Sequence, residues 1–251
     1  IPARFASSRL PGKPLRTLAG KPMILWVYEN ALRLGADFVW VATDDQRIAD
    51  VVTQAGGEAV LTSPDHPTGT DRLAEVARLR GLSSDTMVVN VQGDEPLLGS
   101  RYVELVASAL AAEPSAGIAT LAAPITEVTD RFNPNVVKVV LDGGGWARLF
   151  SRAPVPWVRD SFASFGSGDL PTELPNDVPF LRHVGLYGYR VETLQRLADT
   201  PVVSVERAES LEQLRALHVG IRIHVSVVEE APAHGVDTEE DLARAERLLS
   251  V

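Results

Sequence analysis

The first residues that could do chemistry are the cations near the start of the chain. Residues 1–21 include Arg4, Arg9, Lys13 and Lys21, with glycines between the charges and an apolar helical pattern after them. The whole chain has only three lysines, and two of them lie in this short stretch. Closely spaced cations ahead of a helix suit a polyanion such as a nucleoside triphosphate. The alternative is a surface loop of solvated charges.

Two aspartates are candidates for holding a metal ion. Asp94 follows an apolar strand expected over residues 87–92, and Asp237 directly precedes a helix expected over residues 238–249. Mg²⁺ in proteins is bound by one or two carboxylates together with phosphate oxygens and water. Asp94 is also compatible with an ordinary acidic turn, and Asp237 with an ordinary helix start. The residues alone leave both alternatives open.

Two further groups of residues have types that suit a binding site. Thr68 and Gly69 stand at an expected helix start, where a small hydroxyl and a glycine permit close approach to a base or ribose; a plain N-cap is the alternative. His183, Gly185 and Tyr187 alternate along an expected strand and so share one face. This face either lines a polar pocket or belongs to an ordinary strand.

Composition excludes several classes of function. The net charge of −9 argues against a general nucleic-acid or anionic-membrane binder. The absence of cysteine excludes disulfides, a thiol nucleophile and thiolate metal sites. Neither a P-loop nor a dinucleotide-binding glycine motif is present. Apolar runs are too short for a membrane span and no secretory signal is visible, so we expect a cytoplasmic protein.

The expected elements alternate between helix and strand in the first half of the chain. Helices are expected over residues 23–34, 46–55, 71–80 and 101–112, and strands over 38–43, 59–62, 87–92 and 117–122. Strands dominate the second half, over 136–141, 146–150, 184–190 and 223–228. This order predicts an α/β domain with a mostly parallel sheet covered on both faces and an inserted β-rich lobe. Ligands of such sheets bind beyond the carboxyl ends of the strands.

Two segments depart from this regular pattern. Residues 160–179 are rich in Gly, Ser, Pro and Asp, so we expect them to be too polar to pack a core and interpret them as a mobile flap. Ile1 and Pro2 have the character of a strand end rather than a strand beginning. We therefore expect a few residues of a first strand to precede Ile1.

Nine segments together resemble one enzyme family. In chain order they are IPARFASSRLPGKPL, ATDD, TGTDRLAE, VNVQGDEP, FNPNVVKVVLD, FSRAPVPWVRD, FLRHVGLYGYR, LEQLRAL and GVDTEEDL. Each is weak alone, but nine in order over nearly the whole chain are specific, and they resemble the 3-deoxy-manno-octulosonate cytidylyltransferases, or CMP-Kdo synthetases. The resemblance implies the nucleotide-diphospho-sugar transferase fold, a three-layer Rossmann-like α/β structure with a mostly parallel mixed sheet and an inserted β-rich lobe. It implies a single domain over residues 1–251, with a mainly nucleotide-binding part (1–125), a mainly sugar-binding and dimer lobe (126–230), and a C-terminal helix with a metal-ligand turn (231–251).

The resemblance also implies an activity. Members of this family join CMP from CTP to the anomeric hydroxyl of 3-deoxy-D-manno-octulosonate (Kdo) for lipopolysaccharide biosynthesis. They release pyrophosphate, use Mg²⁺ and usually work as homodimers. We expect in-line attack by the sugar hydroxyl on the α-phosphorus, with no dedicated general base. The alternatives are a related synthetase for another acidic sugar, of the sialate or amino-Kdo type, and a non-catalytic nucleotide-sugar-binding protein.

Site residues follow from the same resemblance. The implied phosphate-binding residues are Arg4, Arg9 and Lys13. The implied Mg²⁺ ligands are Asp94 and Asp237. Cytosine and ribose would be enclosed by the backbone at Ala3 and by Thr68, Gly69 and Arg72. The acidic sugar would be surrounded by Gln92, Arg159, His183, Tyr187, Glu212 and Gln213, with Arg159 facing its carboxylate. Lys21 gains no such role and is interpreted as an ordinary charge ahead of the first helix.

Overall fold

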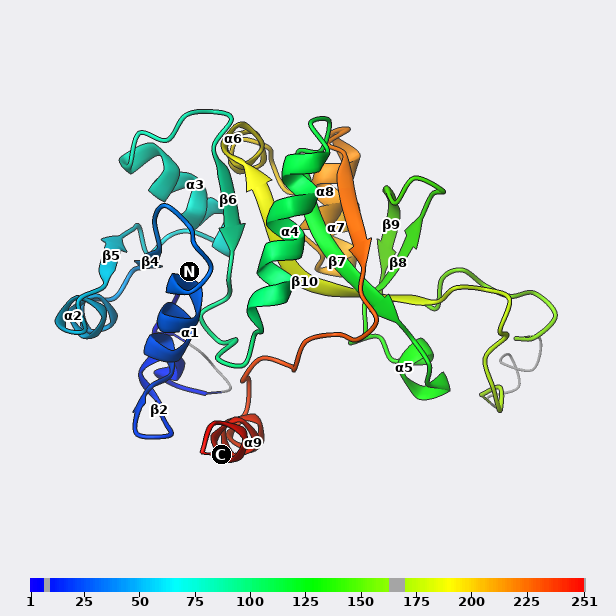
Figure 1. The fold of residues 1–251 in the computed structure, drawn as a ribbon. Coiled ribbons are helices and arrows are strands. Elements are labelled where there is room, and N and C mark those ends of the chain that lie inside the picture. The colour runs from blue at the N-terminus through cyan, green and yellow to red at the C-terminus, as the bar shows by residue number, and fades with distance from the viewer. Residues whose placement is uncertain (7–9, 163–169, 251) are drawn as a thin grey trace. The chain divides into compact units, whose positions relative to one another are not determined.

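The chain folds into two compact α/β units (Figure 1). The structure is a computed structural model that describes residues 1–6, 10–162 and 170–250. Unit 1 is made of Ile1–Ser108, Leu186–Asp199 and Pro232–Val251, and unit 2 of Ala109–Gly185 and Thr200–Ala231. Each unit is therefore assembled from segments that are far apart in the sequence.

Unit 1 contains a parallel sheet with strand order β1-β4-β5. Its strands are β1 (Pro2–Ala3), β4 (Trp40–Thr43) and β5 (Glu58–Leu61). A further strand, β6 (Met87–Asn90), pairs antiparallel with the second half of β10 (Leu181–Arg190), with Tyr187 opposite Asn90. The small antiparallel pair β2 (Thr17–Leu18) and β3 (Lys21–Pro22) follows the single 3-10 turn η1 (Lys13–Leu15).

Helices of unit 1 bury one apolar face each. They are α1 (Met23–Leu32), α2 (Gln46–Gln54), α3 (Gly69–Leu79), α6 (Val191–Ala198), α9 (Glu239–Leu249) and most of α4 (Ser100–Ala112). In α2, Ile48, Ala49 and Val52 are buried at helical spacing, and the Asp45 side chain caps the first turn by accepting from the Arg47 amide. None of the helices in the described parts of the chain is long and apolar enough to cross a membrane.

Unit 2 is richer in strand. β7 (Ile118–Pro124), β8 (Lys138–Leu141), β9 (Ala147–Ser151) and β11 (Ile223–Val227) assemble with the first half of β10 in the order β11-β7-β10-β8-β9. β11 and β7 are parallel, whereas β8 pairs antiparallel with both β10 and β9. The remaining helices are α5 (Val128–Phe132), α7 (Ser204–Glu209) and α8 (Gln213–His218).

The mixed α/β fold predicted from the sequence is confirmed. Every strand and helix expected from periodicity is present, with ends that shift by a few residues. The sequence pattern does not predict α5, α6, α7 and α8, because helices of five to eight residues span too few turns to establish a helical period.

The prediction that residues 160–179 cannot pack a core is wrong. Phe162 is fully buried and packs with Ile125, Val136 and Phe180 in one hydrophobic cluster of unit 2. Leu174 and Val178 cover the same cluster. The described residues of this stretch, 160–162 and 170–179, form no helix or strand, and residues 163–169 of the expected flap lie outside the described part. A few apolar side chains are therefore enough to anchor a polar loop.

Strand β1 is only two residues long, and a cavity of about 470 Å³ lies next to Ile1 within unit 1. Apolar residues of β4, β6, α1, α3 and α4 line it.

Candidate active site

The turn after β6 brings Asp94 toward the start of the chain. The Gly93 amide donates to the Pro2 carbonyl oxygen at 3.2 Å. A Cβ atom on Gly93 would lie only 2.8 Å from that same oxygen, closer than two such atoms can approach. Glycine at position 93 therefore allows this turn to pass directly against β1 and places Asp94 within reach of the first loop.

A second close approach brings Asp237 to the same place. The Val236 amide donates to the Asp94 carbonyl oxygen at 2.8 Å, although the two residues are 142 positions apart. A Cβ on Gly235 would lie 3.1 Å from that oxygen, so a larger residue would push the two segments apart. Asp237 lies two residues after Gly235 and directly precedes Thr238, the N-cap residue of α9.

Lys13 connects both aspartates. Its Nζ donates to Asp94 Oδ2 at 2.6 Å and to Asp237 Oδ1 at 3.0 Å. The Lys13 side chain is 13% exposed, and those of Asp94 and Asp237 are 33% and 44% exposed. Burial acts to lower the pKa of Lys13, but the charges and hydrogen bonds of the two carboxylates outweigh burial and raise that pKa above its ordinary value. Lys13 is therefore a firmly charged ammonium group shared by two carboxylates.

The C-terminal helix is fixed to the first loop by apolar and polar contacts. Buried side chains from both segments form one hydrophobic cluster, which we call the Leu10 cluster: Leu10, Leu18, Met23, Val236, Leu242 and Ala245. Arg16 adds two hydrogen bonds to Glu239 at 2.7 and 2.8 Å, at the first turn of α9. Figure 1 shows α9, in red, close to β2 of this loop. These contacts position Asp237 against Lys13.

The donor chemistry at this point fits a hard divalent cation. The carboxylate oxygens of Asp94 and Asp237 already converge on one positively charged nitrogen, which occupies the kind of position that a metal ion takes. The described residues contain no cluster of three or more His, Asp or Glu side chains suited to a metal. Two protein carboxylates therefore fit a Mg²⁺ ion whose other ligands are phosphate oxygens and water.

The start of α3 forms a second part of the candidate site. Thr68 and Asp71 cap it reciprocally: Thr68 Oγ1 accepts from the Asp71 amide at 3.2 Å, and the Asp71 carboxylate accepts from the Thr68 amide at 3.2 Å. Gly69 lies near Pro2, because a Cβ added to it would be 3.6 Å from Pro2 Cγ. The capped helix start and β1 with Ala3 are therefore neighbours in unit 1.

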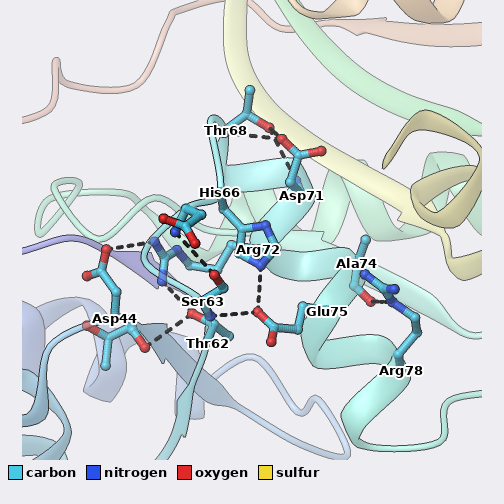
Figure 2. A network of polar contacts seen from close by, with 12 residues as sticks. Asp44, Thr62, Ser63, His66, Thr68, Asp71, Arg72, Ala74, Glu75 and Arg78 are labelled. Atoms are coloured by element: carbon cyan, nitrogen blue, oxygen red, sulfur yellow. Dashed lines mark hydrogen bonds and ion pairs between the residues drawn. The ribbon is translucent and has the colours of Figure 1, made fainter. Parts of the chain in front are cut away.

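Arg72 is engaged inside the protein rather than exposed to a ligand. Its side chain is fully buried, donates to Thr62 Oγ1, and donates to Asp44 Oδ2 at 2.9 Å (Figure 2). The structure therefore does not present Arg72 for the direct nucleotide contact that the resemblance implied. Sequence reasoning did not single out Asp44 as its partner, although the ATDD segment that contains it was one of the matched motifs.

A neighbouring pair fixes the loop ahead of α3. Glu75 accepts from the Ser63 amide at 2.9 Å and lies 2.5 Å from His66 Nε2 (Figure 2). Burial acts to raise the pKa of Glu75, but these hydrogen bonds outweigh it and lower that pKa. The contacts of Ser63 and His66 with Glu75 thus hold the loop that leads to Thr68 against α3.

The structure describes two of the three other cations singled out from the sequence in the first loop, Arg4 and Lys21. Arg4 follows β1 directly and is half-buried, whereas Arg9 lies outside the described residues. Lys21 forms an ion pair with Glu29 and stacks on the Trp26 ring, with its Nζ 3.6 Å from the ring centre. Lys21 therefore has structural partners of its own, in agreement with its interpretation as an ordinary charge.

The predicted sugar-binding residues are divided between the units. Gln92 and Tyr187 belong to unit 1 and are both half-buried. In unit 2, Arg159 is exposed, Gln213 is buried at the start of α8, and Glu212 lies 3.5 Å from the Arg215 guanidinium. The structure therefore brings Lys13, Asp94 and Asp237 together but leaves the grouping of these sugar-binding residues a prediction.

His183 in unit 2 is uncharged at neutral pH. Burial lowers the pKa of its imidazole to about 3. Its Nε2 lies 3.1 Å from Thr120 Oγ1, and its ring packs edge-on against Phe150 with ring centres 5.0 Å apart. A neutral imidazole in this environment can exchange hydrogen bonds with hydroxyl groups but cannot act as a cation.

A mixed α/β fold with a lysine-bridged acidic pair next to a cationic loop is the arrangement expected of a phosphate-binding site of the nucleotidyltransferase type. Comparison with known proteins identifies the family of this chain. A family model described as "Cytidylyltransferase" matches residues 1–223. This chain belongs to the cytidylyltransferase family.

Curated relatives and a solved structure cover nearly the whole chain. The 3-deoxy-manno-octulosonate cytidylyltransferase of Pseudomonas fluorescens is 55% identical over 249 residues, which is 99% of this chain and 96% of that protein. The enzyme of the same name from Pseudomonas syringae pv. syringae is 53% identical with the same coverage. The structure of CMP:2-keto-3-deoxy-manno-octonic acid synthetase complexed with CTP superposes with a TM-score of 0.88 at 41% identity, over 99% of this chain and 96% of that one.

Proposed function

We propose that this protein transfers CMP from CTP to the anomeric hydroxyl of Kdo and releases pyrophosphate. Two relatives named 3-deoxy-manno-octulosonate cytidylyltransferase support this function, and so does a similar solved structure in complex with CTP. The observation that carries it is the convergence of Lys13, Asp94 and Asp237 on one point, because nucleotidyl transfer depends on positioning and on compensation of phosphate charge.

The cationic loop binds the phosphate groups of CTP. Arg4, Arg9 and Lys13 bind the triphosphate and offset the charge that develops on the leaving pyrophosphate. Asp94 and Asp237 hold Mg²⁺, which when bound supplies Lewis-acid stabilisation of phosphate charge. Without a dedicated general base, orienting the sugar hydroxyl in line with the α-phosphorus becomes the main task of the protein.

The nucleoside is bound at β1 and the start of α3. The backbone at Ala3 and the small residues Thr68 and Gly69 enclose cytosine and ribose. Arg72 supports the nucleotide site indirectly, because its buried guanidinium donates hydrogen bonds to Thr62 and Asp44. Its loss would therefore disturb the nucleotide site through these two residues.

Six residues are assigned to the acidic sugar, as the family resemblance implies. Arg159 pairs with the sugar carboxylate, since an exposed guanidinium can bind a carboxylate through two hydrogen bonds. Neutral His183 exchanges hydrogen bonds with sugar hydroxyls. The set is completed by Gln92, Tyr187, Glu212 and Gln213.

Product identification tests this function and separates it from its neighbours. Purified protein is incubated with Mg²⁺, either CTP or UTP, and either Kdo or sialic acid, and the products are identified by mass spectrometry. We expect a CMP-sugar only with CTP and Kdo. A CMP-sialate product would move the protein to the related synthetase, and nucleotide binding without any product would make it a non-catalytic binder.

We further propose that the working assembly is a homodimer. The inserted β-rich part of unit 2 is the segment expected to form the dimer contact. Light scattering on the purified protein should give twice the mass of one chain. A single-chain mass at micromolar protein, together with full activity, would contradict this assembly.

A further inference from the structure

Lys13 lies where a metal ion would neutralise Asp94 and Asp237. Both carboxylates are bonded to the same ammonium group, at 2.6 and 3.0 Å, and that group is largely shielded from solvent. The other lysine of the loop, Lys21, is instead paired with Glu29 and stacked on Trp26. Of the two lysines of the loop, Lys13 alone therefore takes the bridging position.

The bridge solves an electrostatic problem of the protein without nucleotide. Two carboxylates held close together repel each other, and each partly buried charge also loses hydration. The fold cannot relieve this repulsion by letting the segments separate, because the Val236 amide is bonded to the Asp94 carbonyl and the Leu10 cluster holds α9 in place. A cation at this point relieves that repulsion before any substrate arrives.

We propose that Lys13 is an intramolecular counterion that occupies the divalent-cation position until a nucleoside triphosphate draws it away. This inference rests on the proposed function, since it takes Asp94 and Asp237 as the metal ligands. A lysine suits the exchange, because its compact charge sits on a flexible four-carbon chain and can swing from carboxylate to phosphate. The carboxylates would then exchange Lys13 for the metal, and the triphosphate would receive Lys13.

The exchange predicts that the metal and the nucleotide enter together. Without nucleotide, a divalent ion must displace Lys13 from two short hydrogen bonds and leave the ammonium group without a partner. With nucleotide, the phosphate oxygens compensate Lys13 and add ligands for the metal. Binding of either ligand therefore favours the other, as in any linked equilibrium.

Mn²⁺ binding in the absence of nucleotide tests this directly. Free Mn²⁺ is measured by electron paramagnetic resonance during titration of wild type, Lys13→Met and the matched control Lys21→Met. We expect Lys13→Met to bind Mn²⁺ at least about tenfold more tightly than wild type, because removing a unit charge within hydrogen-bond distance exposes both carboxylates. Lys21→Met should bind like wild type. Adding Asp94→Asn to Lys13→Met should abolish the gain.

Equal Mn²⁺ affinity in wild type and Lys13→Met would overturn the inference. If Lys13→Met does not fold, as judged by circular dichroism, Lys13→Gln retains a polar side chain without the charge and must show the same gain. Failure of the proposed metal site is seen separately, with CTP present. If Asp94→Asn with CTP then takes up Mn²⁺ as wild type does, the assignment of Asp94 is wrong whatever the behaviour of the lysine variants.

Discussion

At the scale of residues, the proposed chemistry depends on three charges that the sequence keeps far apart. Lys13, Asp94 and Asp237 come from the first loop, the turn after β6 and the residue ahead of α9. Each of these side chains had an ordinary structural alternative when considered alone. Their meeting at one point favours a shared function, because independent turns have no reason to place two carboxylates on one ammonium group.

Asp94→Asn should lower turnover on the order of 10²-fold or more, comparable to the loss of one strong electrostatic group in an active site. The measurement is the steady-state rate at saturating Mg²⁺. Glu240→Gln is the matched control, since it removes an exposed charge in the first turn of α9 and should leave the rate unchanged. Near-normal turnover in Asp94→Asn would remove Asp94 from the metal site.

Arg159→Ala should raise KM for Kdo and leave the affinity for CTP unchanged, because its guanidinium is expected to pair only with the sugar carboxylate. Initial rates with each substrate varied in turn separate the two effects. Arg148→Ala, an exposed arginine of unit 2 that pairs with Asp142, should change neither value. An equal loss for CTP and Kdo in Arg159→Ala would contradict the assignment.

Lys138 gives a prediction about pH and stability. It is fully buried and donates to the Asn133 and Val136 carbonyl oxygens. Burial, reinforced by the nearby Arg131 charge, lowers the pKa of Lys138 from 10.5 to about 8. Between these two values the unfolded chain binds more protons at this site than the folded protein does. Stability should therefore rise with pH over this range.

The Lys138 prediction is checked by denaturant unfolding at several pH values between 8 and 10. Lys138→Met removes the titrating group, so its unfolding free energy should lack this part of the rise, whatever its stability at pH 8. The same slope in both proteins would show that Lys138 does not contribute.

At the scale of elements, two glycine turns allow the distant segments to meet. Gly93 passes against the Pro2 carbonyl, and Gly235 passes against the Asp94 carbonyl. The strand before Asp94 and the helix after Asp237 were predictable from their apolar patterns. Their close approach was not, because it depends on contacts between segments that no local period reveals.

Gly93→Ala should destabilise unit 1 by about 1–3 kcal/mol, the usual cost of forcing an extra methyl group into a packed site. It should also lower turnover, because the turn that carries Asp94 must shift. Thermal unfolding and steady-state rates measure the two effects. Gly143→Ala is the control, since a Cβ there meets nothing within 4 Å and both properties should stay as in wild type. Unchanged stability in Gly93→Ala would contradict the close approach.

The burial of two side chains could not be predicted from the sequence. Arg72 stands in a motif that the family resemblance connects to the nucleotide, yet its burial is determined by Thr62 and Asp44 from neighbouring segments. Phe162 lies in a polar stretch, and its burial depends on Ile125 and Phe180. In both cases the deciding partner is remote in sequence, so composition and local spacing could not identify it.

At the scale of the whole molecule, the family could be predicted from the order of many weak motifs. Matches over nearly the full chain to enzymes of one name then agree with that prediction. The lysine-bridged acidic pair belongs entirely to unit 1. The proposed phosphate chemistry can thus be tested on variants of unit 1 alone.

The most direct test is a coupled pyrophosphate-release assay on the purified protein with CTP, Mg²⁺ and Kdo, in which each component is omitted in turn. We expect sustained release only when all three are present, and loss of release when Mg²⁺ is chelated. Release that continues without Kdo, or that is unaffected by chelation, would contradict a metal-dependent transfer of CMP to this sugar.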